Sequence, residues 1–324
     1  MRDKGKPSLV NRRYLRIKVF QGLYAYHRTP NADLLKHERD IFESIANLYD
    51  LYLYLIALIM QVQFAGNEMM EANRKKNLPT KEDLNPNLRF LNNRVFQQLS
   101  SNKILKHLIE TKKISWKEEH DDIRKLYKTF REDEAFQLYM IREESNMQLD
   151  KDIVLHLFRE YLGLNELVHA ALEERNIYWQ DDLPMAAISL MKTIENLPES
   201  DFSDRSFIAD LYKDKDEDQQ FVKDLFRKTI QSENEYTELI SEKAQNWETE
   251  RIAMLDMLLM RMALVELEHF PTVPVKVTLN EYIELAKVYS TPKSKVFING
   301  VLDKLVAEFK RDNRINKRGR GLVE

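Results

Sequence analysis

The sequence has 324 residues, of which 43% are hydrophobic and 32% charged, with 7 glycines and 9 prolines. This composition is typical of a soluble, folded chain of one large or two ordinary domains, and it excludes a disordered one. The absence of cysteine excludes disulfides, thiolate nucleophiles and thiolate metal ligands.

Apolar residues recur at helical spacing almost throughout the chain, and no convincing alternating strand is found. We therefore predict an all-α fold. The expected helices lie near residues 10–28, 38–76, 88–110, 117–141, 149–175, 179–196, 218–244, 248–269, 279–289 and 292–311.

The first expected helix combines an apolar stripe with cations and rings. On a helical wheel Leu15, Val19 and Leu23 form a stripe that would dock on the rest of the protein. Arg16 and Tyr24 lie beside it. Cations contact phosphates and rings stack on unpaired bases, so this pattern predicts contact with RNA. In the alternative interpretation the rings widen the core stripe and the arginines extend past it into solvent.

The second expected helix holds the most lipid-like run, "LYLYLIALIM" at residues 51–60. A membrane span needs about 20 apolar residues, roughly twice this length. The run therefore predicts a buried helix. We expect a cytoplasmic protein with no membrane partner.

The clearest breaks between helices are at residues 77–87, 197–204, 214–218 and 271–274. Pro271 and Pro274 predict that residues 270–278 are extended. Thr278 and Glu281 then have the spacing of a capping box at the start of the next helix.

The net charge of −3 is unevenly distributed along the chain. Residues 1–28 hold eight basic residues and one acid, and residues 310–324 hold six basic residues and two acids. Basic ends on an otherwise acidic chain suggest a polyanion partner. Charged termini also occur as solvated tails.

No set of residues with the spacing of an enzyme site is found. The chain lacks a GxGxxG, a phosphate-loop motif and an HExxH. His120, in "EEHDD", has acidic neighbours that point all round a helix and cannot converge on a metal. We predict no catalytic residues, no metal and no cofactor.

A long C-terminal stretch carries a specific resemblance. Residues 250–305 contain "VPVKVTLNEYIELAK" and "SKVFINGVLDK" after a Leu-rich helix with Arg261, Ala263 and Glu266. In this order they closely resemble the closing half of the NusB transcription antitermination family. The opening "RRYLRIKVFQGLYAY" resembles the first helix of that family, and residues 218–245 look like its middle helix.

The resemblance implies a NusB-like helical bundle of two subdomains. Its discontinuous RNA-binding core would be residues 1–30 and 216–311. Residues 31–215 depart from the family pattern and would be a helical insertion of unknown role. Residues 312–324 would be a basic flexible tail, serving either as an RNA-binding arm or for solubility.

The resemblance also implies a function without enzymatic activity, as an RNA-binding transcription antitermination factor. The family pairs with NusE, a ribosomal protein of the small subunit. Together they hold single-stranded boxA-like RNA and join the antitermination complex on RNA polymerase, chiefly at ribosomal RNA operons.

Two sets of site residues follow from the resemblance. The RNA-binding residues would be Arg12, Arg13, Arg16, Lys18, Tyr24, Lys287, Lys295, Phe297 and Asn299. The partner-binding residues would be Asp256, Arg261 and Glu266. Alternatively, Arg261 and Glu266 stabilise their own bundle.

Two other functions are compatible with a helical chain. One is an interaction scaffold whose function lies in residues 31–215. The other is an RNA-targeting module of a ribosomal RNA methyltransferase system. Such enzymes need an α/β cofactor domain and a catalytic cysteine, and this sequence has no cysteine.

Overall fold

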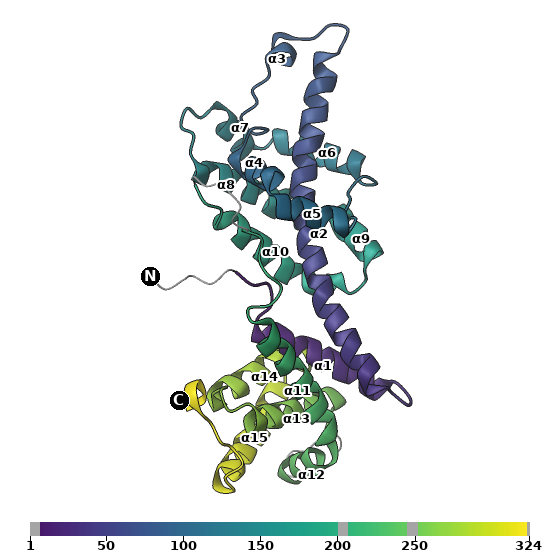
Figure 1. Ribbon diagram of the computed structural model, residues 1–324, viewed down its shortest axis with the longest axis vertical. Coiled ribbons are helices and arrows are strands. Elements are labelled where there is room, and N and C mark those ends of the chain that lie inside the picture. The colour runs from purple at the N-terminus through teal and green to yellow at the C-terminus, as the bar shows by residue number, and fades with distance from the viewer. Residues whose placement is uncertain (1–6, 200–206, 245–251, 323–324) are drawn as a thin grey trace. The chain divides into compact units, whose positions relative to one another are not determined.

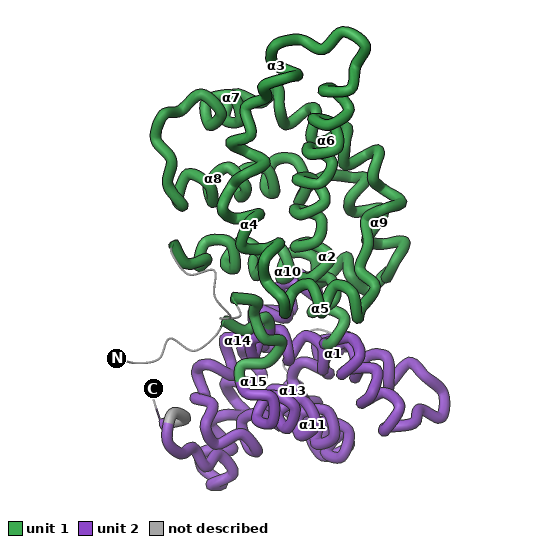
Figure 2. Tube along the Cα trace, turned by 45° about the horizontal axis from the view of Figure 1, so that its top comes forward, with its two compact units in different colours: residues 1–9, 46–213 green, residues 10–45, 214–324 purple. Residues whose placement is uncertain are grey.

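The computed structural model describes residues 7–199, 207–244 and 252–322. Within these ranges the chain is helical, and the one pairing of extended backbone is an isolated bridge between Ser8 and Asp210. The predicted all-α fold class is confirmed. The chain divides into two compact units (Figure 2). Unit 1 comprises residues 1–9 and 46–213, and unit 2 comprises residues 10–45 and 214–324.

Unit 2 is built around α13 (Met254–His269), which packs against every other long helix of its C-terminal part (Figure 1). Its neighbours are α1 (Arg12–Arg28), α11 (Lys215–Gln231), α12 (Glu233–Ala244), α14 (Val275–Tyr289) and α15 (Ser294–Arg311). Residues 258–267 of α13 are all buried. A helix that is covered on all sides must be apolar all round or must pair the charges that it carries.

Unit 1 has its own core, formed around the part of α2 (Leu34–Arg74) that follows residue 45. Leu51, Tyr52, Leu55 and Ile59 of this helix are fully buried. The remaining elements are α3 (Lys81–Leu84), α4 (Arg94–Ser101), α5 (Lys103–Thr111), α6 (His120–Arg131), α7 (Glu134–Ile141), α8 (Met147–Leu157), the π-helix η1 (Phe158–Leu162), α9 (Glu166–Arg175) and α10 (Trp179–Glu195).

Three expected helices of unit 1 are each split by an asparagine or aspartate. Asn102 ends α4 and accepts a hydrogen bond from Leu105 N of α5, at 2.8 Å. Asp133 and Asn165 cap α7 and α9 in the same way. These side chains satisfy the free amides of a helix start, so an apolar run of helical period becomes two short helices.

α2 is the one described helix that is long and apolar enough to cross a membrane. Its best 18-residue window has a mean hydropathy of 1.5, although the uninterrupted apolar run in the sequence is shorter. Buried core helices pass the same test, and 56% of this window is buried within the structure. The helix is therefore weak evidence for a membrane span.

The extended segment expected at residues 270–278 is shorter than predicted. α14 begins at Val275, directly after Pro274, because a proline with φ −61° and ψ 145° can precede a helix without interrupting it. Thr278 therefore lies inside α14, and its hydroxyl donates to Glu266 Oε1 at 2.9 Å. The capping-box prediction for Thr278 is wrong. The expected helix at 248–269 begins only at Met254, and residues 248–251 lie outside the described residues.

The C-terminal segment also differs from the flexible tail that the sequence suggested. Arg314 donates to Glu268 and Glu235, and its guanidinium lies 4.1 Å from the centroid of the Phe309 ring. Lys317 Nζ donates to the backbone oxygens of Glu266 and Phe270 at the end of α13. The segment up to residue 318 is thus attached to unit 2. Residues 323–324 lie outside the described residues.

Candidate nucleic-acid interface

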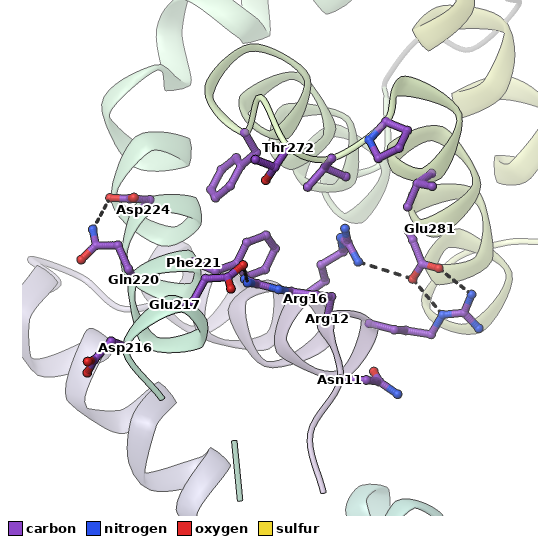
Figure 3. A pocket seen from close by; sticks show the side chains of 15 residues that line it. Asn11, Arg12, Arg16, Asp216, Glu217, Gln220, Phe221, Asp224, Thr272 and Glu281 are labelled. Atoms are coloured by element: carbon purple, nitrogen blue, oxygen red, sulfur yellow. Dashed lines mark hydrogen bonds and ion pairs between the residues drawn. The ribbon is translucent and has the colours of Figure 1, made fainter. Parts of the chain in front are cut away.

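The first turn of α1 lines a groove of about 1260 Å³ in unit 2 (Figure 3). The floor contains Phe221 of α11 and Phe270, whose rings meet edge to face at 5.0 Å between centroids. Cations from α1 and acids from α11 and α14 line the groove together. The lining residues include Arg12, Arg13, Arg16, Asp216, Glu217, Asp224 and Glu281.

Arg12, the first residue of α1, is held by α11. Its guanidinium lies 2.6 Å from Glu217 Oε1 and 3.5 Å from Asp218 Oδ1. It also lies 4.4 Å from the centroid of the Phe221 ring, a cation–π contact. A phosphate would have to replace Glu217 to bind this side chain.

Arg13 forms a bidentate pair with Glu281 of α14, with both nitrogen–oxygen distances at 2.8 Å. This hydrogen bond, more than any other effect, holds the pKa of Glu281 below its ordinary value. The Arg13 side chain is still 51% exposed, so the pair stabilises unit 2 by no more than about 1 kcal/mol. Arg13 is the predicted RNA-binding arginine that solvent reaches most readily.

Arg16 is buried and does not reach solvent. It donates twice to Glu266 of α13, at 2.7 Å each, and Glu266 also accepts from Thr278 and Tyr282. Burial opposes the charge of Arg16, but the attraction and hydrogen bonds of Glu266 outweigh it and raise the pKa of Arg16. The placement does not support the prediction that Arg16 contacts RNA, because its guanidinium joins α1 to α13 in the interior.

Lys18 and Tyr24, both on α1, differ in their exposure to solvent. Lys18 is 3% exposed, and its Nζ lies 5.2 Å from the centroid of the Tyr14 ring. Its predicted contact with RNA conflicts with this burial. Tyr24 is 41% exposed, so its ring is available for stacking on a base.

The four predicted RNA contacts on α14 and α15 are divided between surface and interior. Lys287 and Lys295 are exposed, and Lys287 pairs with Glu284 one turn earlier. Asn299 is half-buried and donates to Asp303 at 3.0 Å. Phe297 is buried, which conflicts with a role in stacking on RNA and instead makes it part of the bundle.

The three predicted partner-binding residues all lie in the interior of unit 2. Asp256 accepts hydrogen bonds from Ser290, which caps the end of α14, and from Ser294, the first residue of α15. Arg261 is 4% exposed and pairs with Glu233 of α12, and Glu266 is fully buried. Their contacts are those of residues that stabilise their own bundle, so direct contact with a partner protein conflicts with their burial.

Sequence reasoning did not single out Lys293. This residue is exposed, directly precedes α15, and forms no ion pair with a described residue. We call Lys287, Lys293 and Lys295 the α15 basic edge. The Phe20 and Tyr289 ring centroids are 5.3 Å apart, and Tyr24 is one turn beyond Phe20, so we expect Tyr24 to lie towards this edge.

A family comparison identifies the C-terminal part of the chain. The model of the NusB family matches residues 185–307. The transcription antitermination protein NusB of Salinibacter ruber is 47% identical over 97 residues, and that of Chloroherpeton thalassium is 48% identical over 85 residues. The C-terminal part of the chain is thus similar to the NusB family. NusB of Natranaerobius thermophilus is 38% identical over 88 residues.

These alignments cover only part of each protein. They span 30%, 26% and 27% of this chain and 61%, 40% and 57% of the three NusB relatives, respectively. No solved structure matches the chain. The NusB match contains α11 to α14 and most of α15, including the α15 basic edge. It begins inside α10 of unit 1, ends at residue 307 inside α15, and does not include α1. The assignment of α1 to the first helix of the family therefore rests on its residues.

Proposed function

We propose that this protein is a non-enzymatic, RNA-binding transcription antitermination factor of the NusB family, acting in the cytoplasm. The observation that carries the proposal is the α15 basic edge, which lies within the family match and towards which we expect the exposed ring of Tyr24 to lie. Exposed lysines bind phosphates, and an exposed ring stacks on an unpaired base, so this surface suits single-stranded RNA.

The roles proposed for α1 divide according to burial. Arg13 and Arg12 contact RNA by exchanging a surface carboxylate for a phosphate, since both guanidiniums are reached by solvent. Arg16, Lys18 and Phe297 act indirectly, by holding the interface in place. Asn299 lies at the margin of the surface.

The proposed partner is a NusE-type ribosomal protein of the small subunit. With it the protein would hold boxA-like RNA within the antitermination complex on RNA polymerase, chiefly at ribosomal RNA operons. The core for this function would be residues 1–30 and 216–311, with 31–215 as the insertion. These limits differ from the observed units chiefly at two places, since residues 1–9 belong to unit 1 and residues 31–45 belong to unit 2.

The test measures binding of fluorescent boxA-like and scrambled RNA to the full chain, with and without a purified NusE-type protein. Lys293→Gln with Lys295→Gln should weaken RNA binding, whereas Lys304→Gln with Lys310→Gln removes the same charge further along α15 and should weaken it less. The partner should tighten RNA binding by roughly 5–150-fold, and RNA should tighten partner binding by the same factor. Equal binding of RNA by the parent and the edge variant would overturn the proposal.

A further inference from the structure

Unit 1 carries a basic surface on α5 that the family comparison does not explain. Residues 103–117 contain five lysines and one histidine but a single acid, Glu110. Unit 1 otherwise has an excess of acids, with 22 basic and 28 acidic residues between positions 46 and 213. The family match begins only at residue 185, so this segment lies outside it.

The cations of α5 lie on one face of the helix, away from the core. Lys103, Lys106 and His107 are spaced three and four residues apart, which places them together on an exposed face. Leu105, on the opposite side, is the one residue of α5 that is fully buried. We call Lys103, Lys106, His107 and the following Lys113 the α5 basic surface.

The folded protein does not neutralise this surface. Lys112 is paired with Asp50, but none of Lys103, Lys106 and Lys113 forms an ion pair with a described residue. Like charges three residues apart on a helix repel one another. Glu110, four residues after Lys106, is the one acid of the segment, and it forms no ion pair with these lysines.

The position of Lys103 and Lys106 opposes the helix dipole. They occupy the first turn of α5, where the partial positive charge of the helix favours acids and disfavours cations. The five following helices of unit 1, α6 to α10, all carry an acid in the first turn. The helix dipole accounts for Lys112 and Lys113 at the far end of α5, but not for Lys103 and Lys106.

From these observations we infer that the α5 basic surface binds the phosphate backbone of RNA. Lysine is a flexible point charge, and the surface has no exposed Phe, Tyr or Trp, so the binding is mainly electrostatic and independent of base sequence. A membrane surface fits less well, because Leu105 is buried in unit 1 and Ile104 is then the one large apolar side chain of α5 that is exposed. The choice of RNA as the polyanion rests on the proposed function.

The test uses the full chain and fluorescent oligouridylate, which lacks the boxA-like sequence, at several salt concentrations. Lys103→Gln with Lys106→Gln should weaken binding by about tenfold at low salt and reduce the slope of log Kd against log salt by about 1.4, because each lost contact with a single strand contributes about 0.7. The melting temperature should stay the same or rise, since an unfavourable interaction with the helix dipole is removed.

The matched control is Lys75→Gln with Lys192→Gln, which removes two exposed lysines from unit 1 that form no ion pair with a described residue. This control should keep nearly the parental affinity and slope. If the α5 variant binds oligouridylate like the control, the inference is wrong. The same conclusion follows if the α5 lysines are needed for binding to phosphatidylserine vesicles but not to RNA. In either case, binding of boxA-like RNA through Lys293 and Lys295 still tests the proposed function separately.

Discussion

The first turns of α1 and α5 both carry cations where the helix dipole disfavours them, but their surroundings differ. Arg12, Arg13 and Arg16 of α1 each contact a carboxylate of unit 2. Lys103 and Lys106 of α5 form no ion pair with a described residue. A dense run of cations in a sequence therefore does not reveal how much positive charge is available to a ligand.

The chemistry of arginine and lysine accounts for this difference between α1 and α5. Arginine offers a planar fork that matches a carboxylate at two points, as in the pairs of Arg13 and Arg16. Lysine has no such geometry and keeps a mobile charge in water. The arginines of α1 thus serve partly to connect this helix to other helices of unit 2, whereas the lysines of α5 expose their charge to solvent.

The largest effect expected from this comparison concerns stability. Arg16→Met leaves Glu266 charged and buried, so it should lower the free energy of unfolding of unit 2 by about 3–5 kcal/mol. Lys106→Met on exposed α5 should change stability by about 0.5 kcal/mol or less. Hydrogen exchange in the full chain gives both values, from α13 peptides for unit 2 and from peptides of the buried part of α2 after residue 45 for unit 1.

A matched control separates the loss of the pair from the loss of volume. Arg16→Met combined with Glu266→Met removes both charges, so part of the lost stability should return. If the double variant is as unstable as the sum of the two single variants, Arg16 and Glu266 do not act as a pair.

The sequence predicts the type of fold better than the roles of individual residues. The helical period identifies most helices, because buried positions must repeat at the spacing of a helix. It missed the breaks at Asn102, Asp133 and Asn165, where a polar side chain caps a new helix inside an apolar pattern. An asparagine or aspartate before an apolar run was the available signal.

The candidate site was harder to predict because burial is a property of the fold. Arg13 and Arg16 are three residues apart and identical in type, yet one is half exposed and the other is in the core. The difference arises from Glu281 and Glu266, which are more than 200 residues away in the sequence. Lys293 is a candidate that the sequence did not indicate. It is exposed in the structure, but no motif or periodicity in the sequence marks it as part of a site.

A smaller effect would show whether the carboxylates of unit 2 compete with RNA. Glu281→Gln keeps a side chain of the same shape but removes the charge that holds Arg13. If RNA binds there, its affinity should rise by about fivefold, close to the 1 kcal/mol that an exposed ion pair can contribute. The measurement is a titration with boxA-like RNA.

The control for this variant is Glu238→Gln, an equal change of charge on the exposed side of α12. It should alter RNA affinity by less than the change at Glu281. An equal gain in both variants would mean that net charge alone, and not release of Arg13, accounts for the result.

A further effect, confined to alkaline pH, concerns Lys317, a cation of unit 2 that donates to backbone carbonyls instead of carboxylates. Burial lowers the pKa of Lys317 to about 8, against about 10.4 for an unfolded chain. Below pH 8 both states are protonated, and the folded state bears the full cost of the buried charge. As the pH rises from about 8 to 10.4 the folded protein loses the proton first, so its stability increases relative to the unfolded chain. The Lys317→Met variant has no titrating group at this position, so its unfolding free energy should lack this increase. The parent should therefore gain stability relative to the variant as the pH rises from about 8 to 10.4. A difference that stays constant with pH, measured by hydrogen exchange of α13, would show that Lys317 titrates as an ordinary surface lysine.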